Sequence, residues 1–233
     1  MKHPTITWSK QLFCASVLFS LIVCPLFAEE HPKIDTADGW KSLLSKDLSA
    51  WKSLGKWAVD EKGVLAREKG GDIWTAEQYG DFILDLEFKV KEKANSGVAI
   101  RVSPAPTKKK RAWYFDGALE VQILAPNNHK KPDKHDCGSM YDLVEASRDV
   151  QKKVGQWNRY TIIAKGSKIK VIFNGEKVVD MDLDNWPEAH KNPDGTKNKY
   201  RKAMKDFPRK GHILLQYHGH PTWFRNVYIK KLD

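Results

Sequence analysis

The segment from Asp81 to Lys91 constrains the fold most, because apolar and polar residues alternate along it. Its apolar positions with a spacing of two are Phe82, Leu84, Leu86, Phe88 and Val90. Successive side chains of a β-strand point to opposite faces of a sheet. This period of two therefore predicts a strand with one buried face and one polar face.

Similar short segments recur along the chain with turn signals between them. Strands are predicted near Trp40 and Trp51 and at 57–59, 64–66, 72–75, 81–91, 98–102, 118–124, 157–164, 168–173, 177–181 and within 211–229. Asn174-Gly175 is a strong signal for a two-residue hairpin, and Asn95-Ser96-Gly97 is predicted as a turn. The polar insert 184–210 contains one short helical candidate, 199–205, and no amphipathic helix of ordinary length is seen. This pattern predicts an all-β sandwich of two antiparallel sheets.

The first 28 residues have the order of a secretory signal peptide. Lys2 and Lys10 form a basic start, an apolar run follows at 12–27, and Ala28 is the small residue at its end. Serines and a proline interrupt the run, which is shorter than the roughly 20 apolar residues that a membrane span needs. We predict cleavage near Ala28, export to the periplasm or outside the cell, no membrane span, and one domain over 29–233.

Cysteine usage agrees with a fold that relies on its core. Cys14 and Cys24 leave with the signal, so Cys137 stands alone and no intramolecular disulfide forms. Acylation of Cys24 as a lipoprotein is the alternative, although Val23 stands where a small residue is expected.

The basic charge does not by itself predict a nucleic-acid partner. Loss of the two signal lysines lowers the formal charge from +11 to +9. The one dense run, Lys108 to Arg111, lies beside two prolines in a predicted loop, and charge runs commonly lie in solvated segments. We expect no nucleic acid as partner. Polyanion binding through the basic surface remains a third class of function, for which affinity would fall steeply with salt.

The last segment, 211–229, gathers polar side chains around a break at Gly219-His220-Pro221. They are Gln216, His218, His220, Trp223, Arg225 and Asn226. Two strands around this turn would hold them together. On other strands, Glu120 and Gln122 share a face, and Arg101 lies on the polar side of 98–102. We therefore predict one polar site lined by these groups.

Seven segments in order resemble the 3-keto-disaccharide hydrolase family, long known as domain of unknown function 1080. They are GDFILDLEFKV at 80–90, NSGVAIR at 95–101, EVQIL at 120–124, GSMYDL at 138–143, GQWNRY at 155–160, NGEKVVDMDL at 174–183 and GHILLQYHGHPTWFRNVYI at 211–229. The resemblance covers nearly all of the chain after the signal. It implies a concanavalin A-like jelly-roll sandwich and action on 3-keto-glycosides by 1,2-elimination and hydration, with hydrolysis as the net result. Family members often have Asp before the His-Gly pair, where this chain has Tyr217.

That chemistry needs a base and an acid within hydrogen-bond reach of their protons, and a donor or cation for the enolate oxygen. We predict Glu120 as the acid/base. His218 is predicted as the second base, since an unperturbed histidine titrates near neutral pH. Arg101 is predicted to stabilise the enolate oxygen or to pair with Glu120. The predicted substrate-binding residues are Gln122, Gln216, Arg225, Asn95 and Trp223, with Asn95 included by its position in the family.

No metal ligand set is assigned, and a divalent metal ion stays an open alternative to a site without cofactor. His218 and His220 have an H-x-H spacing that suits a metal on a strand, but Gly219 and Pro221 favour a turn. The loop residues His129, Asp133, His135, Asp136 and Cys137 are ligands by type with no recognisable spacing. Trp113, Tyr114 and Phe115 are predicted to lie in the core or to form a rim on which a sugar stacks.

The main rival is a non-catalytic, lectin-like module of the same fold, because a fold does not fix function. An enzyme would gather Glu120, His218 and Arg101 around one pocket. A binding module would instead expose aromatic side chains there, without a buried acid–base pair.

Overall fold

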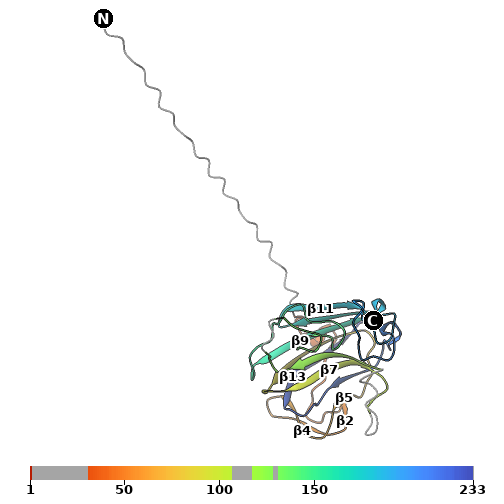
Figure 1. Ribbon diagram of the computed structural model, residues 1–233. Coiled ribbons are helices and arrows are strands. Elements are labelled where there is room, and N and C mark those ends of the chain that lie inside the picture. Colours follow the sequence, from red (N-terminus) through yellow and green to blue (C-terminus); the bar gives the residue numbers. More distant parts are fainter. Residues whose placement is uncertain (2–30, 107–116, 128–130, 233) are drawn as a thin grey trace.

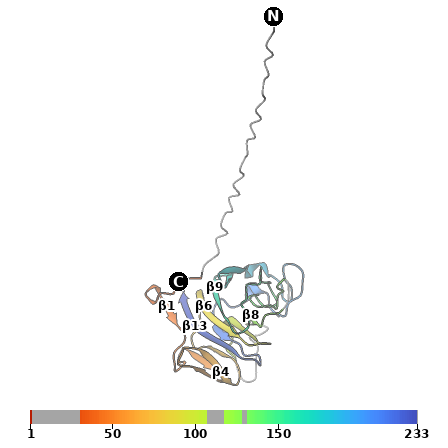
Figure 2. The ribbon, with the colours of Figure 1, turned by 90° about the vertical axis from the view of Figure 1, so that its left-hand side faces the viewer.

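The alternating segments form two antiparallel sheets that pack face to face (Figures 1 and 2). The computed structural model describes the chain outside residues 2–30, 107–116, 128–130 and 233. Within that part, the larger sheet has the order β11-β10-β9-β6-β13-β4-β3, with β1 also paired to β13, and the smaller has the order β2-β5-β12-β7-β8. The predicted all-β, concanavalin A-like jelly-roll sandwich is therefore confirmed.

The strands of the larger sheet are β1 (Trp40–Ser42), β3 (Lys56–Val59), β4 (Leu65–Lys69), β6 (Phe82–Val90), β9 (Trp157–Lys165), β10 (Lys168–Phe173), β11 (Glu176–Asp182) and β13 (Thr222–Lys231). Those of the smaller sheet are β2 (Trp51–Ser53), β5 (Ile73–Thr75), β7 (Asn95–Val102), β8 (Leu119–Leu124) and β12 (His212–Leu215). Three 3₁₀ turns complete the described elements: η1 (Thr36–Asp38), η2 (Leu183–Asn185) and η3 (Met204–Asp206).

The predicted two-faced strand is β6, at the centre of the larger sheet. All five of its alternate apolar residues are fully buried in the core between the sheets. Phe88 packs against Tyr160 of β9, with ring centroids 4.6 Å apart. On the opposite face, Asp85 pairs with Arg159 at 2.9 Å. The period of two therefore predicts both the strand and the face that it buries.

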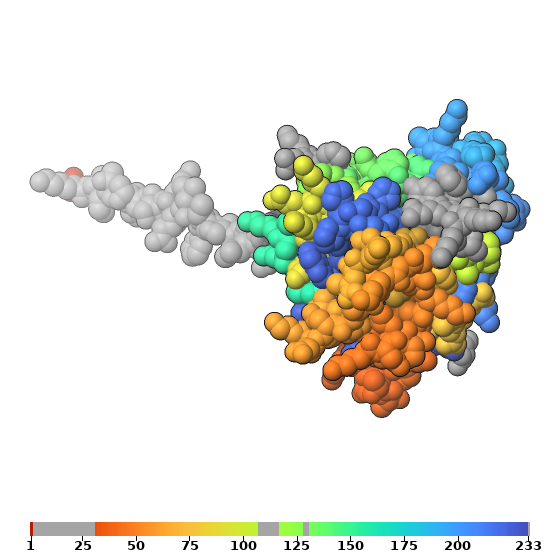
Figure 3. Space-filling model, turned by 90° about the horizontal axis from the view of Figure 1, so that it is seen from below, coloured from red at the N-terminus to blue at the C-terminus, as the bar shows by residue number. Residues whose placement is uncertain are grey.

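The chain's last segment does not form one wall, as the sequence analysis predicted. β12 belongs to the smaller sheet and β13 to the larger, so the turn around Gly219 crosses between the two sheets. Figure 3 shows the C-terminal segment, in blue, against the N-terminal strands, in orange, and β13 pairs there with β4. Polar residues before and after the turn are thus carried by different sheets.

Two local predictions are wrong. Asn95-Ser96-Gly97 is not a turn but the start of β7, and the turn lies just before it, where Lys93 has a φ of 59°. The helix predicted over 199–205 is absent, and only η3 lies nearby. The insert instead folds through side-chain hydrogen bonds to backbone groups, as asparagine and aspartate favour.

Several predictions concern residues outside the described part of the chain. These are the signal peptide with Cys24, the basic run Lys108 to Arg111, the aromatic residues Trp113, Tyr114 and Phe115, and His129. In the described residues, the structure contains no helix with the length and apolar character that a membrane span requires.

We expect Tyr160→Phe to lower the free energy of unfolding by about 1 kcal/mol, the net contribution of a typical hydrogen bond. The Tyr160 hydroxyl, on the larger sheet, donates to the backbone carbonyl of Gln122 on the smaller sheet at 2.7 Å. Urea denaturation provides the measurement, with Tyr228→Phe, on the half-exposed outer face, as control. Equal effects of the two substitutions would contradict a specific link between the sheets.

Candidate active site

Glu120 lies on β8 with its side chain on the face of the smaller sheet that points away from the core. Its neighbours Leu119 and Val121 lie in the core, while Glu120 crosses over Gly97 of the adjacent strand. A Cβ at position 97 would lie 2.3 Å from Glu120 Oε1, so only glycine leaves room for the carboxyl group there. Glu120 is nonetheless only 3% exposed, because other segments cover this face.

The covering group next to Glu120 is Lys199, from the polar insert. Its Nζ lies 3.6 Å from Glu120 Oε2, and its side chain is 12% exposed. Burial raises the pKa of Glu120 to about 7, against the opposing effect of the Lys199 charge. Burial likewise lowers the pKa of Lys199 to about 8, against the attraction of Glu120 and Asp142. Two groups that would ordinarily both be charged are therefore poised to exchange a proton near neutral pH.

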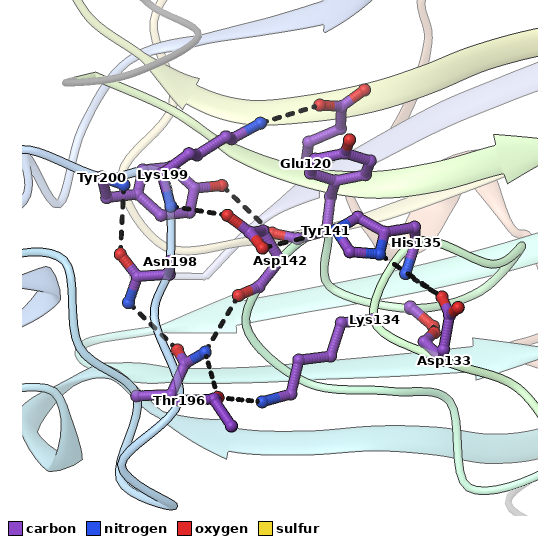
Figure 4. A network of polar contacts seen from close by, with 12 residues as sticks. Glu120, Asp133, Lys134, His135, Tyr141, Asp142, Thr196, Asn198, Lys199 and Tyr200 are labelled. Carbon is purple, nitrogen blue, oxygen red and sulfur yellow. Dashed lines mark hydrogen bonds and ion pairs between the residues drawn. The ribbon is translucent and has the colours of Figure 1, made fainter.

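Hydrogen bonds from a second loop hold Lys199 in place (Figure 4). The Lys199 backbone N–H donates to Asp142 Oδ2 at 2.5 Å. The Tyr200 hydroxyl donates to the carbonyl of Tyr141 at 3.4 Å, and the Lys199 ammonium lies 4.2 Å from the Tyr141 ring centroid. His135 approaches the other oxygen of Asp142 at 3.4 Å. The lysine is thus placed by a folded insert and not by a flexible chain.

Three amide side chains surround the carboxyl group. Gln122 is buried on the same face, and its Nε2 donates to Asn95 Oδ1 at 3.5 Å. The Gln216 side chain lies near enough to Glu120 to lower the Glu120 pKa slightly against the dominant effect of burial. Glu120 Oε2 and Gln122 Oε1 are buried without a hydrogen-bond partner within the described residues. Glu120 Oε2 has the Lys199 ion pair at 3.6 Å as its nearest polar contact among those residues.

Arg101 does not join this group. Its φ of 55° interrupts the alternation of β7, and the side chain points toward the start of β6 and the turn after β9 in the larger sheet. The guanidinium donates to the carbonyl of Gly166 at 2.7 Å and pairs with Asp81 at 3.2 Å. The predicted pairing with Glu120 is therefore wrong, because one residue in a left-handed conformation reverses the side that the sequence pattern indicates.

His218 and His220 lie in the loop between β12 and β13, and both are exposed. His218 lines a hollow with Gly70, Gly71, Tyr217 and Gly219, and this hollow does not include Glu120. The loop confirms the turn that the flanking Gly and Pro indicate, and it does not place the two imidazoles on one strand face. In the described ranges, no three His, Cys, Asp or Glu side chains are grouped to hold a metal ion.

Arg225 and Trp223 lie on the opposite side of the sandwich from Glu120. They project from the outer face of the larger sheet, where Arg225 pairs with Glu87 at 2.5 Å. Lys89 lies 5.0 Å from the Trp223 ring centroid and 4.9 Å from that of Trp157. The core between the sheets separates these residues from Glu120, so the structure does not bring them to the same site. The adjacent Asn226 has a φ of 50° at a bulge of β13.

The loop residues that resemble metal ligands by type have structural contacts. Asp136 accepts a hydrogen bond from the backbone N–H of Asp133 at 2.8 Å. Cys137 is buried, and burial raises its pKa to about 12, so the thiol stays protonated near neutral pH. His135 stacks edge-on against Tyr141, with ring centroids 4.9 Å apart. Their contribution is to support the loop that carries Tyr141 and Asp142.

Lys199, Tyr141 and Asp142 are the residues that the sequence analysis missed. Lys199 lies in a polar insert without periodicity, where no pattern separates one lysine from its neighbours. Tyr141 and Asp142 lie in GSMYDL, one of the seven segments that resemble the family. That resemblance is the sequence signal by which these two residues could have been found.

The fold and the geometry define a β-sandwich protein with a buried pair of a carboxyl group and an amine on the outer face of its smaller sheet. A family model described as a 3-keto-α-glucoside-1,2-lyase-like domain matches residues 39–230. The chain belongs to this family.

Individual relatives agree with this membership. A 3-keto-disaccharide hydrolase of Bacteroides thetaiotaomicron is 26% identical over 84% of this chain and 80% of its own length. A crystal structure from Parabacteroides distasonis, named provisionally as a glycosyl hydrolase, is 36% identical with a TM-score of 0.73, over 83% of this chain and 99% of its own. A second from that organism, with the same provisional name, is 23% identical with a TM-score of 0.68, over 85% and 96%, and shows the fold alone.

We expect the stability of the wild type, relative to Glu120→Gln, to fall between about pH 4.5 and 7. The pKa of Glu120 is higher in the folded state, so the folded chain binds more protons in this window and stability falls as pH rises. The loss is on the order of 3 kcal/mol at most. His31, whose pKa burial lowers to about 4, titrates in both proteins and cancels in the difference. Denaturation at several pH values is the measurement, and parallel curves would contradict the raised pKa.

Proposed function

We propose that this chain cleaves 3-keto-glycosides by 1,2-elimination followed by hydration, with hydrolysis as the net result. Family membership and the named relatives support the coarser statement that it is a carbohydrate-active hydrolase. The observation that carries the finer statement is the buried Glu120–Lys199 pair.

The reaction requires proton transfer at carbon. A ketone at C3 acidifies the C2 proton, a base removes it, and the glycosidic oxygen then leaves from C1. Water afterwards adds across the double bond. A base with a pKa near the working pH is the most effective, and burial places the pKa of Glu120 at about 7. We assign Glu120 as the group that removes the C2 proton and returns a proton to the leaving oxygen.

The remaining groups have distinct roles. Lys199 faces the carbonyl side, where negative charge develops, and takes the role that the sequence analysis gave to Arg101. Gln122, Gln216 and Asn95 bind sugar hydroxyls. His218, on the exposed loop after β12, is retained as the proposed second proton-transfer group. Arg225 and Trp223 take no part, because they lie on the other sheet's outer face.

An ordinary glycosidase mechanism is less well supported. Such enzymes use two carboxyl groups at defined separations across the glycosidic bond. The ion-pair partner of Glu120 is an amine. Asp72 is near enough to raise the Glu120 pKa, but its carboxyl group is engaged by the Tyr217 backbone N–H at 2.9 Å. An amine beside a carboxyl group suits chemistry at a carbonyl.

The rival proposal, a lectin-like binding module, does not account for this pair. Burying an amine and a carboxyl group is costly even when they form an ion pair, and sugar binding needs only hydrogen bonds and aromatic faces. Export is the remaining part of the proposal and rests on the signal-like order of residues 1–28.

Turnover of 3-keto-trehalose or 3-keto-sucrose, with and without chelator, tests the proposal by release of the unmodified sugar. We expect Glu120→Gln to lower kcat by about 100-fold or more, since general acid–base catalysis contributes roughly 10²–10⁴. Glu87→Gln is the matched control, because Glu87 lies on the outer face of the other sheet. His218→Ala tests the second proton-transfer group without disturbing a buried residue.

Two results would contradict different parts of the proposed function. No turnover by the wild type under any metal condition would contradict the enzyme and favour the binding module, which calorimetry with the same sugars would detect. An active wild type with fully active Glu120→Gln and His218→Ala variants would contradict the residue roles alone.

A further inference from the structure

We propose that Lys199 is a covalent catalyst, whose Nζ forms an imine with the C3 ketone of the substrate. This inference rests on the proposed function, because it requires a ketone in the site. In this proposal Lys199 forms a covalent bond to the substrate, in addition to supplying positive charge.

The first support is the position of the amine. Lys199 Nζ lies 3.6 Å from Glu120 Oε2, a separation longer than a hydrogen bond. Tyr141 and Tyr200 flank the ammonium at 4.2 and 5.2 Å from their ring centroids. The side chain retains 12% exposure, so its end is covered but still reachable from solvent. An amine and a carboxyl group are thus held at one place, as the proposed imine formation requires.

The second support is the rigidity of the segment that carries Lys199. Asn192 receives the indole N–H of Trp186 at 2.9 Å and the Asn198 amide at 3.0 Å, and it donates to the carbonyl of Asp142 at 3.2 Å. Asn192 and Asn198 are buried in an insert whose residues are mostly exposed. An ion pair alone does not need such a scaffold, whereas a nucleophile must meet a carbonyl carbon at a fixed angle and distance.

The third support is the protonation state that this geometry favours. An amine attacks a carbonyl only in its neutral form, and desolvation is one way in which proteins activate lysine for imine formation. Burial acts in opposite directions on the two groups, lowering the pKa of Lys199 and raising that of Glu120. Both changes in pKa favour the neutral amine and the neutral acid more than water does.

The steps balance without a further reactant. Neutral Lys199 adds to C3 to give a carbinolamine, and the acid form of Glu120 donates the proton with which hydroxide leaves as water. The Glu120 carboxylate then removes the C2 proton, and the electron pair moves into the enamine. That electron pair forms the C1–C2 double bond as the glycosidic oxygen leaves with the Glu120 proton. Water adds at C1, C2 is reprotonated, and a second water releases the ketone from Lys199.

Reductive trapping tests this inference. The full chain is incubated with 3-keto-trehalose and sodium cyanoborohydride, followed by intact mass measurement, peptide mapping and a turnover assay of the same sample without reductant. We expect one reduced keto-sugar on Lys199 and none elsewhere. Lys199→Arg keeps the positive charge but forms no imine, so we expect it to lose both the label and at least 100-fold in kcat.

The control is Lys134→Arg. Lys134 is also partly covered, at 19% exposure, and pairs with Asp194 at 2.7 Å, but no carboxyl group of the site contacts its Nζ. We expect this variant to be labelled on Lys199 and to turn over like the wild type. Circular dichroism and a melting curve establish that each variant is folded.

The possible failures are distinguishable. Turnover without a label on Lys199, or a Lys199→Arg variant that keeps most of its activity, overturns the imine and leaves the proposed function standing. A label on Lys199 without turnover supports the imine and overturns the proposed function. Neither label nor turnover overturns both.

Discussion

The site depends on one costly arrangement, the removal of Glu120 and Lys199 from water at 3.6 Å from each other. Desolvating a carboxylate and an ammonium costs several kcal/mol each, and their attraction does not always repay that cost. The pKa changes have the same cause, because burial raises the pKa of Glu120 and lowers that of Lys199, and both changes favour the neutral forms. A protein that keeps such a pair must obtain its stability elsewhere.

The source of that stability is the core between the sheets. Strands such as β6 and β9 bury all of their inward side chains, and Tyr160 extends from this core to the carbonyl of Gln122. The face that carries Glu120 is the other side of the same strand β8. Because side chains alternate along a strand, the core residues Val121 and Ile123 fix the direction of Glu120 and Gln122. Packing on one face therefore positions the candidate site on the other.

Alternation explains both what the sequence predicts and where that prediction stops. It gives the strands, the buried face of β6 and the shared face of Glu120 and Gln122. It fails at Arg101, where a single left-handed residue reverses a side chain, and over 211–229, where the chain crosses between sheets. Alternation gives no information about Lys199, because its position depends on hydrogen bonds between side chains and backbone groups within an insert. Long-range contacts of this kind leave no periodic trace in a sequence.

The departure at Tyr217 can be understood from its contacts. The backbone N–H of Tyr217 donates to Asp72, and its ring lies under the Arg67 guanidinium, 3.4 Å from the centroid. An aspartate at this position would place a carboxyl group near the same cation. Tyrosine instead makes a cation–π contact with Arg67. Tyr217 therefore changes the hollow that His218 lines. The Glu120–Lys199 pair is positioned by β8 and by the insert 184–210, and Tyr217 belongs to neither.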